Sequence, residues 1–314
     1  MKIASMLVVL QIMSEPSAGS LNIPQKMVAS NGIAITDESS DRLPRSTSYN
    51  IHADFAPDRE YKSSSIEIKN GKIILDIKVN GKNTKAVLDT GSSATIIDNN
   101  LADRLGLRSS GNPLLIKKLG NIKTLKTSLS NMVLLDIPRQ VNIKTNCVLM
   151  NLEDLSKIVG NDVGIVIGRD ILMTSSIYIN FDDNELIIKP SGYIEASHPA
   201  IKSFISDDGL INVRIGARRI DALVDTGYAG ILKLNDNDLL SVKSSNSSLK
   251  MGASIKMTID VAGITSEIPI DTNSKSNPTM TNSLLGLGFL RNVNLILDLS
   301  RHRMFLVPRK KLSF

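Results

Sequence analysis

The chain has 314 residues, of which 42% are hydrophobic, so it is long enough for two globular domains of ordinary size. It has no tryptophan and only 4% aromatic residues, so its core must consist mainly of Ile, Leu and Val, which favours β structure. The net charge of +6 is spread along the chain rather than gathered in one stretch, and we therefore expect no nucleic-acid partner.

Cysteine and histidine do not form a pattern that indicates a metal site. Cys147 is the only cysteine, so the chain can form no intramolecular disulfide and its redox compartment stays open. The histidines, His52, His198 and His302, are scattered, and none lies four residues from another. We expect no metal and no other cofactor.

The first 20 residues match a secretory signal peptide in outline. Lys2 precedes a mostly apolar stretch at 3–13, and small residues follow it. The stretch is too short for a transmembrane helix. It predicts export, to a bacterial periplasm or out of the cell; the alternative is a partly ordered N-terminus on a cytoplasmic protein. Residues 21–65 show no sustained hydrophobic period, which is typical of a linker or a poorly ordered extension.

Strand-like alternation begins at Ile66 and leads to an unusual turn. Hydrophobic residues alternate through residue 79, Asn80-Gly81 predicts a tight hairpin, and residues 84–88 form the returning strand. That strand ends in Asp89-Thr90-Gly91, and the chain is apolar again by residue 97. Burial raises the pKa of a carboxyl group unless something stabilises its charge. A core has no use for such an acid, so the turn indicates a functional site.

The rest of the first half predicts short helices between strands. Asp98 can cap a helix that ends at Gly106. Several strands are expected over residues 114–148, and a second helix over 152–158. Residues 164–167 then form an apolar strand that ends at Gly168, and residues 177–188 form a hairpin that turns at 182–184.

The second half repeats this order in shorter form. Residues 222–230 read Ala-Leu-Val-Asp-Thr-Gly-Tyr-Ala-Gly, which places Asp225 136 residues after Asp89 (225 minus 89). A single Asp-Thr-Gly occurs by chance in roughly one chain in twenty of this size. The second copy is followed by a short helix, by paired strands at 254–261 and 265–270, and by an apolar strand that ends at Gly286. The shared order indicates an internal repeat.

This order of elements resembles that of the aspartic proteases. It is most similar to the retropepsin-like group in its compact lobes, and to the pepsins in having both lobes in one chain. The resemblance covers residues 66–308. It implies an all-β, pseudo-twofold fold of two lobes, residues 66–190 and 205–308, and an endopeptidase that acts as a monomer on peptide or protein substrates.

The resemblance also implies roles for individual residues. Asp89 and Asp225 would be the catalytic pair, sharing one proton while one of them activates a water. Thr90 and Thr226 would bond across the lobe interface. The other residues expected to support the catalytic loops are Gly91, Ser92, Gly227, Gly168 and Gly286.

Some positions depart from the family pattern. The Ser92 hydroxyl is expected to bond the outer oxygen of Asp89, but Tyr228, bulky for the site, takes the equivalent place in the second lobe. One flap is expected, near Lys117 to Lys126. Arg169 follows the brace glycine, but Ser93 stands where its acidic partner would be, so that pair is not expected.

Two other functions stay open. One is a catalytically inactive protein that binds peptides on the same fold, which Tyr228 motivates. The other is a structural or envelope-associated protein that uses its basic surface.

Overall fold

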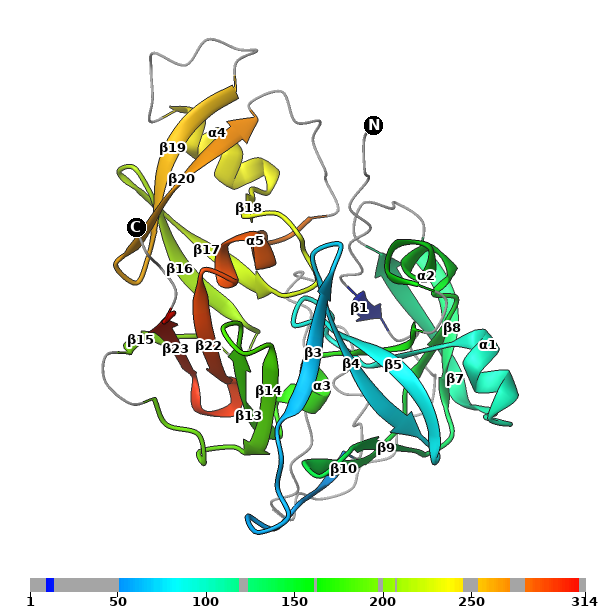
Figure 1. Cartoon of the computed structure of the whole chain (residues 1–314). Helices are drawn as coiled ribbons and strands as arrows, with labels where there is room; N and C mark the ends of the chain where they lie inside the picture. Colours follow the sequence, from blue (N-terminus) through cyan, green and yellow to red (C-terminus); the bar gives the residue numbers. More distant parts are fainter. Residues whose placement is uncertain are drawn as a thin grey trace, which may run out of the picture.

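The computed structural model describes residues 10–13, 51–118, 124–160, 163–196, 200–206, 208–244, 254–271 and 280–310. Strands dominate these ranges and the helices are short, which confirms the predicted all-β fold of two lobes (Figure 1). Within the described ranges, no helix is both long and apolar enough to cross a membrane.

The first lobe is built from hairpins connected by short helices. Its strands are β2 (His52–Phe55), β3 (Ser64–Lys69), β4 (Lys72–Val79), β5 (Lys82–Leu88), β6 (Ile96–Asp98), β7 (Ser109–Lys118), β8 (Thr124–Ser130), β9 (Val133–Ile137), β10 (Val141–Thr145), β11 (Val148–Met150), β12 (Val163–Ile167), β13 (Ser175–Asn180) and β14 (Glu185–Pro190). Its helices are α1 (Asn99–Arg104), α2 (Glu153–Val159) and α3 (Arg169–Leu172).

The second lobe is smaller. Its strands are β15 (Ile201–Phe204), β16 (Leu210–Ile215), β17 (Arg218–Asp225), β18 (Leu232–Lys233), β19 (Ser254–Val261), β20 (Ile264–Asp271), β21 (Ser283–Gly286), β22 (Val293–Asp298) and β23 (Arg303–Pro308). Its helices are α4 (Asp236–Ser244), α5 (Leu287–Leu290) and a 3-10 turn, η1 (Leu299–Arg301).

Several local predictions are confirmed. The Asp98 side chain caps α1 by accepting hydrogen bonds from the backbone N–H groups of Asn100 and Leu101. The expected helix after residue 152 is α2, and the hairpin that turns at 182–184 is β13–β14. The expected strands at 254–261 and 265–270 pair as β19 and β20.

The two halves use the same strand pairing around their Asp-Thr-Gly turns. In the first lobe, β5 is parallel to β12, and β12 is antiparallel to β6. In the second lobe, β17 is parallel to β21, and β21 is antiparallel to β18. The carboxyl end of a buried strand therefore delivers each Asp, and a parallel neighbour that ends in glycine supports it.

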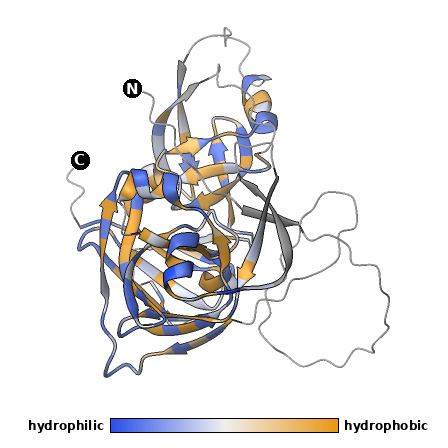
Figure 2. Cartoon of the chain, turned by 90° about the vertical axis from the view of Figure 1, so that its right-hand side faces the viewer, coloured by the Kyte–Doolittle hydropathy of each residue, from blue (hydrophilic) through white to orange (hydrophobic). Residues whose placement is uncertain are grey.

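A central sheet joins the lobes. Its order is β3–β14–β13–β22–β23–β15, and the first lobe meets the second where β13 pairs with β22, Tyr178 opposite Ile296. One hydrophobic cluster extends through both lobes, from Ile77 in the first to Val213 in the second. Figure 2 shows hydrophobic residues on the inner strands and hydrophilic residues at hairpin turns. This shared core holds the two Asp-Thr-Gly turns at a fixed separation.

The N-terminal region differs in part from expectation. Leu10–Met13, inside the predicted signal peptide, form strand β1, which pairs with β7; the rest of residues 1–50 lies outside the described residues. Residues 52–55, expected in a poorly ordered extension, form β2 on the edge of β10. The reason is partial burial, since Ala53 and Phe55 pack against the core.

The buried carboxylate of Asp182, in the β13–β14 turn, ties the segment that follows β23 to the central sheet. Asp182 accepts hydrogen bonds from Arg309 Nε (2.9 Å), the Lys310 backbone N–H (2.9 Å) and Asn294 Nδ2 (2.9 Å). Burial raises the pKa of Asp182, but these hydrogen bonds outweigh burial and lower the pKa to about 2.

We predict that Asp182→Asn destabilises the protein by on the order of 1–2 kcal/mol at pH 7. A pKa depressed in the folded state contributes stability above the unfolded pKa of the carboxyl and loses it as pH falls toward about 2. Urea denaturation of Asp182→Asn and wild type should therefore converge in acid. Asp103→Asn, an exposed carboxylate on α1, is the control, and a pH-independent difference for Asp182→Asn would contradict the prediction.

Candidate active site

Two carboxyl groups are buried where the lobes meet. Asp89 follows β5 and is 6% exposed, and Asp225 ends β17 and is 0% exposed. The Asp89 N–H donates to the Ile167 carbonyl on the parallel strand β12 (3.0 Å), and Asp225 pairs with Gly286 on β21. The strand pairs that the sequence repeats thus place both acids at the lobe interface.

The two carboxyl groups face each other across paired glycines. A Cβ built on Gly91 would overlap the Asp225 carboxyl, and one built on Gly227 would overlap the Asp89 carboxyl. Each loop backbone therefore passes directly against the acid of the other lobe, and only glycine leaves that space. Each carboxyl group is close enough to the other to shift its pKa.

Backbone N–H groups hold the inner oxygen of each acid. Asp89 Oδ1 accepts from the N–H groups of Gly91 (2.9 Å) and Ser92 (3.2 Å). Asp225 Oδ1 accepts from the Gly227 N–H (2.8 Å). The first loop thus gives its acid one more donor than the second, which favours charge on Asp89.

Burial and neighbouring charges shift the pKa values of the two acids. Burial raises the pKa of Asp225 well above its ordinary value, and the nearby charge of Asp89 raises it further. Burial also raises the pKa of Asp89, but the positive charge of Lys72 and the loop N–H groups oppose the rise. Both influences favour the proton on Asp225 and the charge on Asp89, although the two titrations belong to the pair as a whole.

The two threonines bind each loop to the other lobe. Thr90 N–H donates to Thr226 Oγ1 (3.0 Å), and Thr226 N–H donates to Thr90 Oγ1 (3.0 Å). Each hydroxyl then donates to a carbonyl of the opposite strand, Thr90 to Val224 (2.6 Å) and Thr226 to Leu88 (2.8 Å). The structure thus brings together the threonines that the sequence placed 136 residues apart.

The brace glycines lie where neighbouring backbone comes close. A Cβ on Gly168 would overlap the backbone of Ala94, and one on Gly286 would overlap the Gly230 carbonyl. The Gly168 N–H donates to Thr95 Oγ1 (3.1 Å), and the Gly286 N–H donates to the Ile231 carbonyl (2.9 Å). Both glycines therefore let the segment that follows each Asp-Thr-Gly turn pack tightly on the strand that supports it.

The expectation for the Ser92 hydroxyl is wrong. Its Oγ donates to the Ala94 carbonyl (2.7 Å) rather than to Asp89, and its backbone N–H makes the contact with the acid. The tight turn after Gly91 brings the Ala94 carbonyl within reach of the hydroxyl, so the side chain closes its own loop.

Tyr228 finds space beside two glycines. Its ring lies against Gly230 and Gly286, where any Cβ would overlap it, and its edge packs on the cluster formed by Leu223, Met280 and Leu284. The Tyr228 carbonyl accepts from the Leu287 N–H (2.7 Å). The side chain is thus part of the second lobe's packing, and its bulk is accommodated by the missing side chains of the glycines.

Three contributors to the site were missed from the sequence. Thr95 donates from its N–H and its hydroxyl to the buried Asp170 (2.8 and 2.7 Å), which fixes the segment that follows the first loop. Lys72, 5% exposed, donates to the Gly227 carbonyl. A second hairpin signal, Asn70-Gly71 just before Lys72, could have drawn attention to it.

Arg169 binds the backbone of the first Asp-Thr-Gly loop. Its Nη1 donates to the Thr90 carbonyl (2.8 Å), and Asp208 of the second lobe faces it. Of the acids near Arg169, Asp208 of the second lobe acts on it most strongly.

The expected flap region is a hairpin of β7 and β8, although its tip, residues 119–123, lies outside the described residues. In the second lobe, β19 pairs with β16, with Asp260 opposite Arg214. In the first lobe, β9 pairs with β4 in the same way, with Asp136 opposite Lys78. Hairpin β19–β20 therefore corresponds to β9–β10. The described part of the second lobe has no counterpart of β7–β8.

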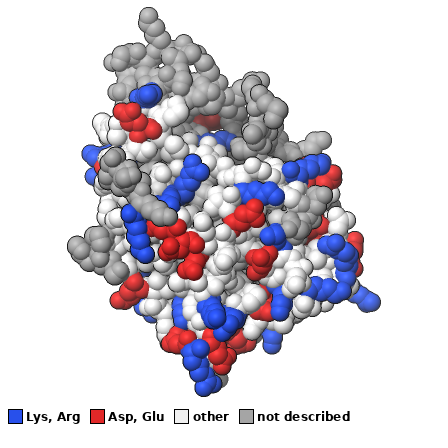
Figure 3. Space-filling view, in the orientation of Figure 1, with Lys and Arg blue, Asp and Glu red and all other residues white. Residues whose placement is uncertain are grey.

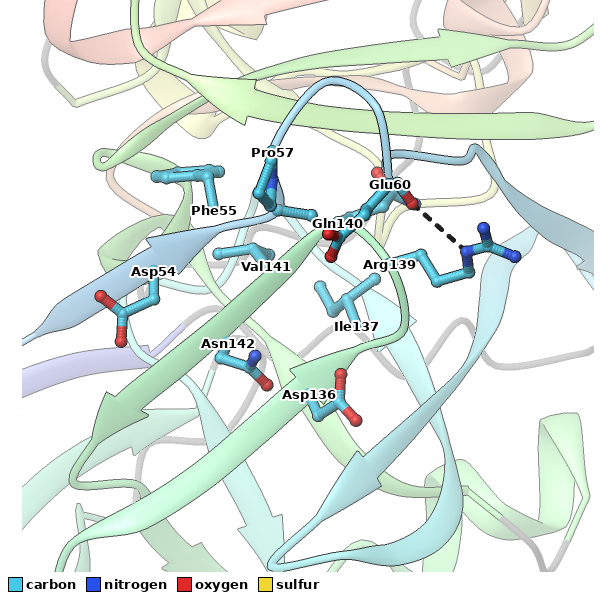
Figure 4. A pocket seen from close by; sticks show the side chains of 11 residues that line it. Asp54, Phe55, Pro57, Glu60, Asp136, Ile137, Arg139, Gln140, Val141 and Asn142 are labelled. Atoms are coloured by element: carbon cyan, nitrogen blue, oxygen red, sulfur yellow. Dashed lines mark hydrogen bonds between the residues drawn. The ribbon is translucent and has the colours of Figure 1, made fainter.

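A cavity of about 450 Å³ lies away from the two acids, between β2 and the β9–β10 hairpin (Figure 4). Arg139 Nε donates to the Glu60 carbonyl at its rim (3.3 Å). The buried Gln140 in its wall is fully engaged, with bonds to Tyr61, Ser64 and the backbone of β14. Because its buried polar groups are satisfied, this cavity is a weaker candidate than the paired acids.

The comparison with protein families agrees with this site. Residues 75–171 match the family described as aspartyl protease, which supports a hydrolase of the protease class. The matched segment covers about a third of the chain and includes Asp89 and Gly168; the second lobe lies outside it. A comparison with curated proteins finds no match.

We predict that Thr226→Val lowers the free energy of unfolding by about 2–4 kcal/mol, because it leaves the buried Thr90 N–H and Leu88 carbonyl without partners. Thr226→Ser keeps the hydroxyl and should cost about 1 kcal/mol. Urea denaturation compares the two, and equal losses would show that the hydroxyl is not what holds the lobes.

We also predict that Asp225→Asn stabilises the protein at neutral pH. A carboxyl whose folded pKa is raised gives full stability below its unfolded pKa and loses it as pH rises through the folded pKa. Asparagine cannot ionise, so its advantage in Tm should grow from about pH 4 to pH 8. Asp221→Asn, an exposed site on the same strand, is the control; an advantage that is constant with pH would contradict the assignment.

Proposed function

We propose that the chain is an aspartic-type endopeptidase that hydrolyses peptide bonds with a water activated by Asp89 and Asp225. The observation that carries this proposal is the facing of two buried carboxyl groups, one from each lobe, with pKa values raised to different extents. A pair that shares one proton supplies a base and an acid in one place.

In the proposed reaction, ionised Asp89 accepts a proton from the attacking water. Protonated Asp225 donates a hydrogen bond to the scissile carbonyl and stabilises the charge that develops on its oxygen. The resulting tetrahedral intermediate collapses when the amide nitrogen receives a proton from the pair. No covalent link to the protein forms, and the shared proton is restored at the end of the cycle.

The proposed substrate is an extended peptide that lies between the lobes, under the β7–β8 hairpin. Because one chain supplies both acids, the enzyme should act as a monomer. We further propose that residues 1–20 direct export; the N-terminal sequence of the mature protein tests this.

A non-cleaving peptide binder on the same fold is the second candidate. The Ser92 hydroxyl bonds the Ala94 carbonyl, and Tyr228 replaces its counterpart, so neither side chain supplies a hydroxyl to the pair as the family pattern expects. Binding through a basic surface is less favoured, since Figure 3 shows Lys and Arg interspersed with Asp and Glu on the face in view.

The test is cleavage of a mixed peptide library by the full chain between about pH 3 and pH 8. Asp89→Asn and Asp225→Asn should each lower the rate by on the order of 10³-fold or more, because each removes one member of the acid–base pair. Pepstatin should inhibit the wild type.

Asp221→Asn is the matched control and should cleave like the wild type, since this carboxylate is exposed and away from the pair. A folded wild type that binds peptides without cutting them at any pH would favour the non-cleaving binder. Activity that rises with the square of protein concentration would contradict the monomer.

A further inference from the structure

A buried lysine lies beside the paired acids. Lys72 begins β4 directly after the Asn70-Gly71 turn, whose two residues both have positive φ (50° and 71°). This β3–β4 hairpin lies between the lobes (Figure 1), and Gly71 at its tip packs against Ala229 of the second catalytic loop. The hairpin thereby brings the Lys72 ammonium to the Gly227 carbonyl, two residues beyond Asp225.

The equivalent position in the second lobe carries the opposite charge. Lys72 precedes Asp89 by 17 residues (89 minus 72), and Asp208 precedes Asp225 by the same number (225 minus 208). The strand register makes the positions equivalent, because Leu75 pairs with Ala86 as Ile211 pairs with Ala222. The site is thus electrostatically asymmetric in spite of its symmetric backbone.

The brace helices carry a matching asymmetry. Arg169 follows Gly168 and donates to the carbonyls of Thr90 (2.8 Å) and Gly91 (3.4 Å) in the first loop. The residue after Gly286 is Leu287, which has no charge to offer the second loop. Lys72 reaches across from the first lobe and bonds Gly227, the counterpart of Gly91. Each loop thereby has one cation on its backbone.

The two cations differ in what faces them. Asp208 is the acid that acts most strongly on Arg169, followed by Asp225, Asp89 and then Asp170, so Arg169 divides its charge between the pair and two other carboxyl groups. Lys72 acts on Asp89 and Asp225 themselves. The Tyr228 phenol also lies in this region, and burial together with the charge of Asp225 raises its pKa.

We propose that Lys72 is a positioning residue for the peptidase reaction, one that fixes the second loop through Gly227 and whose charge sets the pH range in which the acid pair holds a single proton. The expected effect on the cleavage rate rests on the proposed function. The effect of the Lys72 charge on the titration of the two acids can be measured without any substrate.

The direction of the effect follows from the charges. Lys72 favours the ionised forms of both acids, so it lowers the pKa of each, and it is the largest influence opposing burial at Asp89. Without this charge, Asp89 would be protonated at a higher pH and could no longer accept a proton from water. Asp225 would also keep its proton to a higher pH.

The test compares Lys72→Gln, Lys72→Arg and Lys72→Met in the full chain. Gln removes the charge but keeps a donor for the Gly227 carbonyl, Arg keeps both, and Met removes both. The pH–rate profile of Lys72→Gln should cross that of the wild type, with about a tenfold lower rate at the acid end and a smaller loss or a gain at the alkaline end. Lys72→Arg should restore the acid end.

Lys69→Gln is the matched control, since Lys69 pairs with Lys72 across the same turn and is exposed. Its profile should match the wild type. A Lys72→Gln rate that falls by one factor at every pH would overturn the electrostatic role, because a purely structural defect does not move the profile.

Carboxyl ¹³C NMR titration of aspartate-labelled protein provides the readout that needs no substrate, with Asp89→Asn and Asp225→Asn to assign the two signals. Both titrations should move to higher pH in Lys72→Gln and in Lys72→Met, and return in Lys72→Arg. Unmoved titrations would overturn the inference even in an active enzyme. A wild type that cleaves nothing would instead refute the proposed function and leave this titration to decide about Lys72.

Discussion

The close approach of two buried carboxyl groups is the constraint on which the other features of this structure depend. Two like charges in a dry interface repel strongly, so the pair is tolerable only with a shared proton and fixed partners. Gly91 and Gly227 provide the space, and the threonine bonds provide the rigidity. The central sheet and continuous core then oppose separation of the lobes.

The two halves repeat a backbone but not an electrostatic environment. Arg169, on which Asp208 acts most strongly, donates to the backbone of the first loop. Lys72 donates to the backbone of the second loop from the opposite lobe. A pair of acids can divide the roles of acid and base only if something distinguishes them, and fused lobes allow each copy to diverge. The extra N–H donor on Asp89 acts in the same direction.

Positions that depart from the family pattern are explained by local packing. Tyr228 fits because Gly230 and Gly286 leave the space that its ring fills. The Ser92 hydroxyl serves the turn itself, through the Ala94 carbonyl. The acids are therefore held mainly by backbone N–H groups, which a change of side chain does not remove.

The sequence by itself determined the order of strands, the hairpin at Asn80-Gly81 and the two Asp-Thr-Gly loops, because alternation, turn residues and repeats are local signals. It also predicted the pairing of Thr90 with Thr226 by resemblance. Only the tertiary structure placed Lys72 on the opposite loop, Asp208 against Arg169 and the Ser92 hydroxyl on Ala94. These contacts depend on how the lobes approach each other and on rotamers set by packing. Neither the approach of the lobes nor the choice of rotamer produces a period or a spacing in the amino-acid sequence.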